Sequence, residues 1–130
     1  MNPRDFFEDG TVTISTTTYT VYKTKQPEET AFATIQDANE TTVVAEDGTV
    51  DESNVVESEP GWKLLTFEMV LPFELVGFLA VVASELADED ISIFALSAYS
   101  TDHVLVKTDD VAAATKKLES LGCTVRVTAN

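Results

Sequence analysis

The spacing of hydrophobic and polar residues changes near the middle of the chain. Thr11–Lys25 is rich in Thr, Val, Ile and Tyr and predicts one long strand or two short ones. Ala31–Gln36 and Thr41–Glu46 predict two further strands, joined at Asp37–Glu40 by a short turn with room for one helical turn. Asp51–Gly61 is polar, acidic and closed by Pro-Gly, so we expect the boundary between two subdomains there.

The second half begins with a clearer strand-then-helix pattern. Trp62–Val70 predicts a strand, and Pro72 suits the first turn of a following helix, where Glu74 would face the positive end of the helix dipole. Five apolar residues recur at helical spacing through this segment: Leu75, Phe78, Leu79, Val82 and Leu86. We therefore expect an amphipathic helix that ends near Asp88–Asp90.

Two more strands are predicted after that helix. Ile91–Tyr99 is almost continuously apolar, so both of its faces are expected to be covered. Ser100–Asp102 turns the chain, and His103–Lys107 returns as the next strand.

A second helix and a final strand complete the pattern. Thr108 or Asp109 is suited to cap the helix, and Gly122 suits the position just after its end. The final strand, Thr124–Thr128, is expected to turn Val125 and Val127 inward.

The predicted order in the second half is β-α-β-β-α-β. This order predicts an α+β, ferredoxin-like fold, in which two helices cover one face of a four-stranded antiparallel sheet. The first half suggests a smaller, β-rich, reduced copy of the same unit. We therefore predict two units, residues 1–60 and residues 61–130.

The charge of the chain excludes some partners. The 130 residues include 8 Lys and Arg and 23 Asp and Glu, which gives a net charge of −15. Such a surface repels nucleic acids and anionic membranes, so neither is expected as a partner. Because 44% of the residues are hydrophobic and the acids are dispersed, we interpret the charge as adaptation of a folded surface to high salt.

The cysteine content and the apolar runs bear on location. Cys123 is the single cysteine, so neither an intramolecular disulfide nor a zinc site is expected. Met1–Gly10 lacks the apolar region of a secretory signal, and the longest apolar run, Leu75–Ala83, is about half of a membrane span. We expect a cytoplasmic protein.

Enzymatic chemistry finds little support in the sequence. His103 is the only histidine, and although Asp102 precedes it, no nucleophile is adjacent. No glycine-rich phosphate loop is present, and no cofactor or metal is expected. We interpret His103 as a strand-end histidine and keep a small enzyme that uses it as the weakest alternative.

Two segments are candidates for ligand binding. Around Gly77, the amides of a helix start could hold an anion, or the glycine could serve only close packing of the helix. Ser97–Asp102 offers hydroxyls, an aromatic ring and one carboxylate, or it is simply a hairpin turn. If both segments lie at the same edge of the sheet, they form one site.

A family resemblance covers most of the chain and is weaker in the first half. The chain resembles the ACT-domain group related to the CASTOR arginine sensors, whose prokaryotic members are small proteins with two ACT-like units. The residues that carry the resemblance are Trp62–Leu65, Leu71–Phe73, Gly77–Ala80, Leu86–Ala87 and, most specifically, Ile91–Val106. The resemblance implies a non-enzymatic regulatory module that binds a small molecule, often an amino acid, between paired units.

The resemblance also implies particular site residues. It points to Gly77, Tyr99 and Asp102. With two neighbours in the same segments, the predicted ligand-binding residues are Gly77, Phe78, Tyr99, Thr101 and Asp102. Asp102 stands where the arginine sensors place an acid that faces the ligand, and it would attract an amino or guanidinium group.

Two departures from the group argue against selectivity for arginine. Ala80 replaces a further acid of the arginine sensors, and Ala98 replaces a hydroxyl residue. The leading hypothesis is therefore a sensor of an amino acid, with a second copy or a partner protein completing the assembly. The alternative is an interaction or self-association module of the same fold that binds no small ligand.

Overall fold

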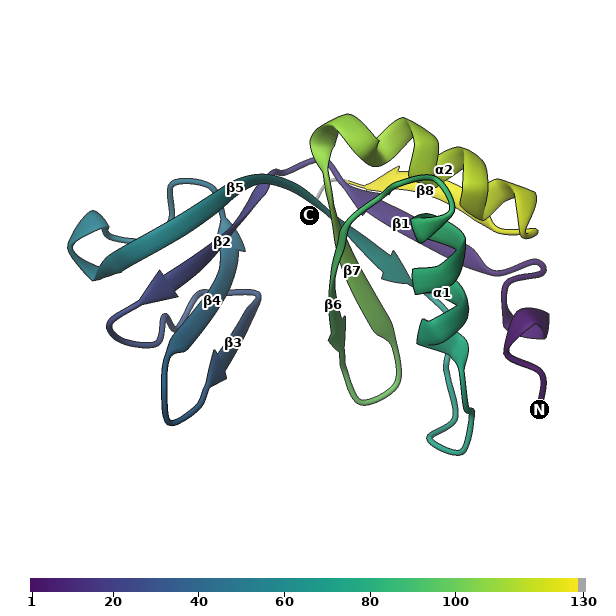
Figure 1. The fold of residues 1–130 in the computed structure, drawn as a ribbon, viewed down its shortest axis with the longest axis horizontal. Helices are drawn as coiled ribbons and strands as arrows, with labels where there is room; N and C mark the ends of the chain where they lie inside the picture. The colour runs from purple at the N-terminus through teal and green to yellow at the C-terminus, as the bar shows by residue number, and fades with distance from the viewer. Residues whose placement is uncertain (129–130) are drawn as a thin grey trace. The chain divides into compact units, whose positions relative to one another are not determined.

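The computed structural model describes residues 1–128, and the chain forms two compact units. The larger unit combines Met1–Thr16 with Lys63–Asn130, and the smaller unit is Thr17–Trp62 (Figure 1). This division differs from the expected one at residue 60, because the N-terminal strand completes the sheet of the larger unit.

The sheet of the larger unit has the strand order β8-β1-β5-β7-β6. The bounds are β1 Thr11–Ser15, β5 Val55–Phe67, β6 Ile93–Ser97, β7 Asp102–Lys107 and β8 Thr124–Thr128, with helices α1 Phe78–Ala87 and α2 Val111–Ser120. Strand β1 lies between β5, to which it is antiparallel, and β8, to which it is parallel. The β-α-β-β-α-β order is thus confirmed, but the expected four-stranded antiparallel sheet has a fifth strand inserted.

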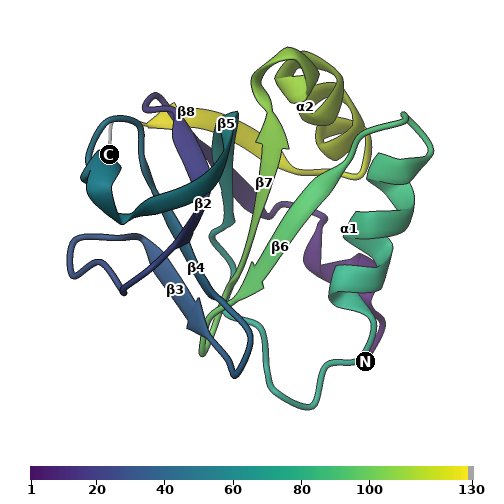
Figure 2. The ribbon, with the colours of Figure 1, turned by 60° about the vertical axis from the view of Figure 1, so that its left-hand side comes forward.

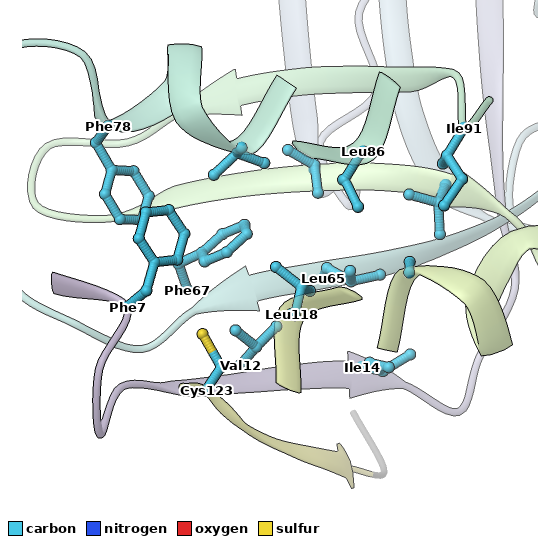
Figure 3. Packing of buried hydrophobic residues seen from close by; sticks show 14 residues of the cluster. Phe7, Val12, Ile14, Leu65, Phe67, Phe78, Leu86, Ile91, Leu118 and Cys123 are labelled. Atoms are coloured by element: carbon cyan, nitrogen blue, oxygen red, sulfur yellow. The ribbon is translucent and has the colours of Figure 1, made fainter. Parts of the chain in front are cut away.

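Both helices pack on one face of this sheet (Figure 2), where their buried side chains form a single hydrophobic core with those of β1, β5 and β7. Phe7, from the N-terminal segment, fills one end of this core. Its ring stacks on Phe78 with centroids 4.7 Å apart and lies edge-on to Phe67 at 6.4 Å (Figure 3). This role could not be predicted from the sequence, because Phe7 stands in a short acidic segment.

The smaller unit is an antiparallel sheet with the strand order β3-β4-β2-β5. Its further strands are β2 Tyr19–Thr24, β3 Ala33–Gln36 and β4 Thr41–Glu46. The order and directions are those of a β-α-β-β-α-β unit, with loops and a 3-10 turn at Glu52–Asn54 where helices would stand. The expected β-rich, reduced copy therefore describes this unit well. Asp37–Glu40 forms the β3–β4 turn, whose amides at Asn39 and Glu40 donate to Asp37 Oδ1.

Several local expectations were wrong for identifiable reasons. Most of the expected boundary, Val55–Gly61, belongs to β5, whose acidic side chains are exposed while its backbone pairs with β2. Strand β6 is an edge of its sheet, so its side chains are not covered on both faces. Val127, expected inside, is 69% exposed because β8 is the other edge.

The second helix also differs from expectation at its start. Helix α2 follows a 3-10 turn at Thr108–Asp110, and its cap residue is Asp110, which makes no side-chain capping hydrogen bond. The end of the helix is as predicted, because Gly122 follows the cap residue Leu121 with a φ of 106°.

Candidate functional site

Two loops of the larger unit enclose a pocket of about 250 Å³. One loop joins β5 to α1, and the other is the β6–β7 turn. They are tied together by a hydrogen bond of 2.8 Å that the Leu71 amide donates to the Ser100 carbonyl. All five residues predicted to bind a ligand line this pocket: Gly77, Phe78, Tyr99, Thr101 and Asp102. The two candidate segments are thus brought together as one site.

The first wall of the pocket is the start of α1. The helix begins at Phe78 rather than at Pro72, because Gly77 has φ 90° and ψ 5°, a conformation that no helix interior contains. Pro72 and Glu74 therefore belong to the preceding loop, where the Leu75 amide donates to the Pro72 carbonyl.

The amides of this helix start are available to a ligand. The helical ladder opens with the Val81 amide donating to the Gly77 carbonyl at 3.0 Å, and Gly77 provides no side-chain cap. The amides before Val81 therefore have no acceptor within the helix. Together with the positive end of the helix dipole, they favour an anionic group at this wall.

The second wall carries the carboxylate. Asp102 pairs with Ser97 across the β6–β7 hairpin, and the Ser97 hydroxyl donates to Asp102 Oδ1 at 2.7 Å. The turn between them is closed by the Ala98 amide, which donates to the Thr101 carbonyl at 2.8 Å. In the described part of the chain, no hydrogen bond engages Asp102 Oδ2. The serine thus fixes the carboxylate and leaves its second oxygen for a cationic group.

Two aromatic rings stand at the mouth of the pocket. Phe73 and Tyr99 meet edge to face with centroids 4.8 Å apart. Their exposed fractions, 72% and 81%, are unusual for large apolar side chains. The position of Tyr99 was predicted, whereas the role of Phe73 was missed, and an aromatic residue beside a proline in a loop is the signal that could have shown it.

The titratable groups outside the pocket offer little chemistry. His103 does not line the pocket, and its Nδ1 lies 3.0 Å from the Thr66 hydroxyl. Burial lowers the pKa of His103, while the Asp102 and Glu68 carboxylates partly oppose this. Burial raises the pKa of the Cys123 thiol to about 11. Within residues 1–128, no three His, Cys, Asp or Glu side chains gather where they could hold a metal ion.

Solved structures share this fold at low sequence identity. A protein from Agobacterium tumefaciens superimposes with a TM-score of 0.79 and 19% identity, covering 94% of this chain and 96% of that one. A Vibrio cholerae protein of unknown function, described as a possible transport protein, has a TM-score of 0.73 and 20% identity, covering 89% of this chain and 93% of that one. The regulatory subunit of aspartate kinase from Thermus thermophilus has a TM-score of 0.64 and 9% identity, covering 88% of this chain and 97% of that one. These likenesses establish the fold.

Comparisons at the level of sequence are more limited. No curated protein matches the chain. Among residues 1–128, no helix has the length and apolar character needed to cross a membrane. The ACT domain family model matches residues 57–120, which run from β5 to the end of α2 and include every residue that lines the pocket. Residues 57–120 of this chain are therefore similar to the ACT domain family.

Proposed function

We propose that the chain is a non-enzymatic regulatory module that binds a small molecule, an amino acid, in the pocket between the β5–α1 loop and the β6–β7 turn. One observation carries the proposal: Asp102 lines the same pocket as Gly77 and Phe78, whose amides make no hydrogen bond within residues 1–128. The α-carboxylate of an amino acid suits the amides, and its ammonium group suits Asp102 Oδ2.

The chemistry of the pocket favours binding over catalysis. Its lining supplies hydroxyls, amides, a carboxylate and apolar side chains, but no His, Cys or Lys that could transfer a proton or attack a substrate. His103, the basis of the enzymatic alternative, is turned toward Thr66 instead. The resemblance of Ile91–Val106 to the CASTOR-related group also supports a sensor, and Ala80 supports a ligand other than arginine.

A thermal-shift screen of the twenty amino acids tests the proposal. A ligand at a hundred times its Kd stabilises the folded state by about 2.7 kcal/mol, which raises the melting temperature by several degrees. Asp102→Asn should abolish this shift, because asparagine keeps an acceptor for Ser97 but loses the charge. Asp109→Asn, an exposed acid outside the pocket, is the matched control and should keep it. If no amino acid shifts the melting temperature, the proposal fails.

The second candidate is an interaction or self-association module without a small ligand. It is favoured by four exposed apolar side chains in or beside the pocket loops: Val70, Phe73, Val76 and Tyr99. Exposed apolar groups that gather in this way mark interaction surfaces. Light scattering on wild type and Phe73→Ser discriminates the two functions. A ligand-independent oligomer that Phe73→Ser dissociates, with no thermal shift by any amino acid, would favour this candidate.

A further inference from the structure

A second cavity lies entirely within the smaller unit. It has a volume of about 250 Å³ and is lined by Tyr19, Thr30, Phe32, Glu46 and Thr49, none of which belongs to the pocket described above. The sheet register builds it: Tyr19, at the start of β2, pairs directly with Glu46, at the end of β4. Phe32 lies just before β3, and the centroid of its ring is 6.1 Å from the centroid of the Tyr19 ring.

Tyr19 is the most buried of the residues that line this cavity. Tyr19 is only 4% exposed, and its hydroxyl makes no hydrogen bond among the described residues. Every fully buried side-chain oxygen or nitrogen in that part of the chain has a partner, so this hydroxyl must belong to the small exposed remainder of Tyr19. Tyr19 therefore contributes a partly exposed hydroxyl to the residues that line the cavity, while its ring is covered by the protein.

Glu46 contributes a carboxylate that protein groups do not neutralise. Across residues 1–128, its side chain enters no hydrogen bond and no ion pair, in contrast to the neighbouring Asp47, which accepts a 2.6 Å hydrogen bond from the Thr20 hydroxyl. The Thr49 hydroxyl donates to the Glu46 carbonyl at 2.7 Å, so its oxygen can still accept. The polar atoms of the cavity are therefore mainly acceptors.

The charge around the cavity indicates that a bound molecule would be positively charged. Residues 17–62 carry ten carboxylates and two lysines, so their field attracts cations and repels anions. An exposed aromatic ring beside a carboxylate attracts alkylammonium groups, since ring faces and carboxylates both attract a diffuse positive charge. We propose that this cavity binds an organic cation, an ammonium or quaternary ammonium group that contacts the Phe32 ring, which is 40% exposed, and pairs with Glu46.

Amide NMR spectra during titration with choline test the proposal. The control ligand is dimethylbutanol, the neutral alcohol in which carbon replaces the quaternary nitrogen of choline. At constant ionic strength, choline should give saturable shifts centred on residues 19, 30–32 and 46–49, and dimethylbutanol should bind more weakly. Glu46→Gln should weaken choline binding about three- to tenfold, and Phe32→Leu, which removes the ring but keeps an apolar side chain, should also weaken it.

The matched control is Glu40→Gln, which removes the same charge from just before the other end of β4. It should leave choline affinity within about twofold of wild type, since a distant exposed charge is screened by salt. Equal binding of choline and dimethylbutanol would overturn the proposal, as would equal losses in Glu40→Gln and Glu46→Gln. Shifts confined to residues 71–79 and 97–102 would overturn it by placing the cation in the other pocket.

Discussion

Replacing Gly77 with alanine tests the geometry of the start of α1, which lines the pocket. Gly77 has φ 90° and ψ 5°, a region that alanine occupies only with strain. A Cβ built on Gly77 meets only Pro3 Cγ, at 3.6 Å, which is ordinary contact. The cost of Gly77→Ala is therefore in the backbone, and we expect a loss of about 1–2 kcal/mol in the free energy of unfolding.

The sign of the change in the free energy of unfolding distinguishes a helix that begins at Phe78 from one that begins at Pro72, as the sequence pattern predicted. If Gly77 stood inside a helix starting at Pro72, alanine would stabilise the protein by about 1 kcal/mol, because it is the better helix former. Urea denaturation followed by circular dichroism measures the difference. Gly48→Ala is the matched control, because Gly48 also has a positive φ, 77°, with nothing within 4 Å of the added Cβ.

Both alanine variants should lose stability, and Gly77→Asn should lose less, because asparagine tolerates positive φ better than alanine. Stabilisation by Gly77→Ala alongside destabilisation by Gly48→Ala would refute the helix start described here. It would also remove the first-turn amides from the wall of the pocket.

Three further predictions concern the core, the histidine and the surface charge. Phe7→Ala removes a ring that is 1% exposed and stacked on Phe78, so urea denaturation should show a loss of about 3–5 kcal/mol in the free energy of unfolding. The exposed Phe73 is the control, and Phe73→Ala should lose less than about 1 kcal/mol. Equal losses in the two variants would contradict the buried packing of Phe7. Because burial lowers the folded-state pKa of His103 below the ordinary value of about 6.5, the unfolded chain binds the proton more readily. The free energy of unfolding should therefore fall as the pH drops through about 6.5, and His103→Gln should flatten this region of the pH profile; the same slope in both proteins would contradict it. If the charge of −15 reflects adaptation to high salt, the melting temperature should rise between low and molar salt, where repulsion is screened, and a constant melting temperature would argue against that origin.

Local patterns predicted the elements that are buried on one side. Thr41–Glu46 is β4 to the residue, because its buried positions pack against β2 and β3. The apolar stripe also identified α1, whose buried residues are Phe78, Val82 and Leu86. In such elements, the periodicity of the sequence records the face that meets the core.

Other features depend on partners that lie far away in the sequence. The parallel pairing of β1 with β8 joins segments more than a hundred residues apart, and nothing local to Thr11–Ser15 specifies it. The exposure of β6 likewise depends on its place at the sheet edge, since an apolar strand looks the same at an edge and in the middle. The helix start was misplaced because Leu75 continues the apolar stripe beyond Gly77, whose φ interrupts the helix.

The candidate site was predictable in its residues but not in its contacts. Gly77, Tyr99 and Asp102 were identified from the family resemblance, and they do line one pocket. The Ser97 hydroxyl that orients Asp102 and the contact between Phe73 and Tyr99 depend on the hairpin register and on the path of the loop. These follow from tertiary structure rather than from spacing in the sequence.

The most direct test of amino-acid binding is an amide NMR titration with the amino acid that gives the largest thermal shift. We expect saturable shifts concentrated in residues 71–79 and 97–102, the two segments that line the pocket, and we expect their loss in Asp102→Asn. Asp109→Asn should titrate like wild type. Saturable binding that survives Asp102→Asn would contradict the binding of an amino acid in this pocket. Shifts confined to residues outside both segments would contradict it as well.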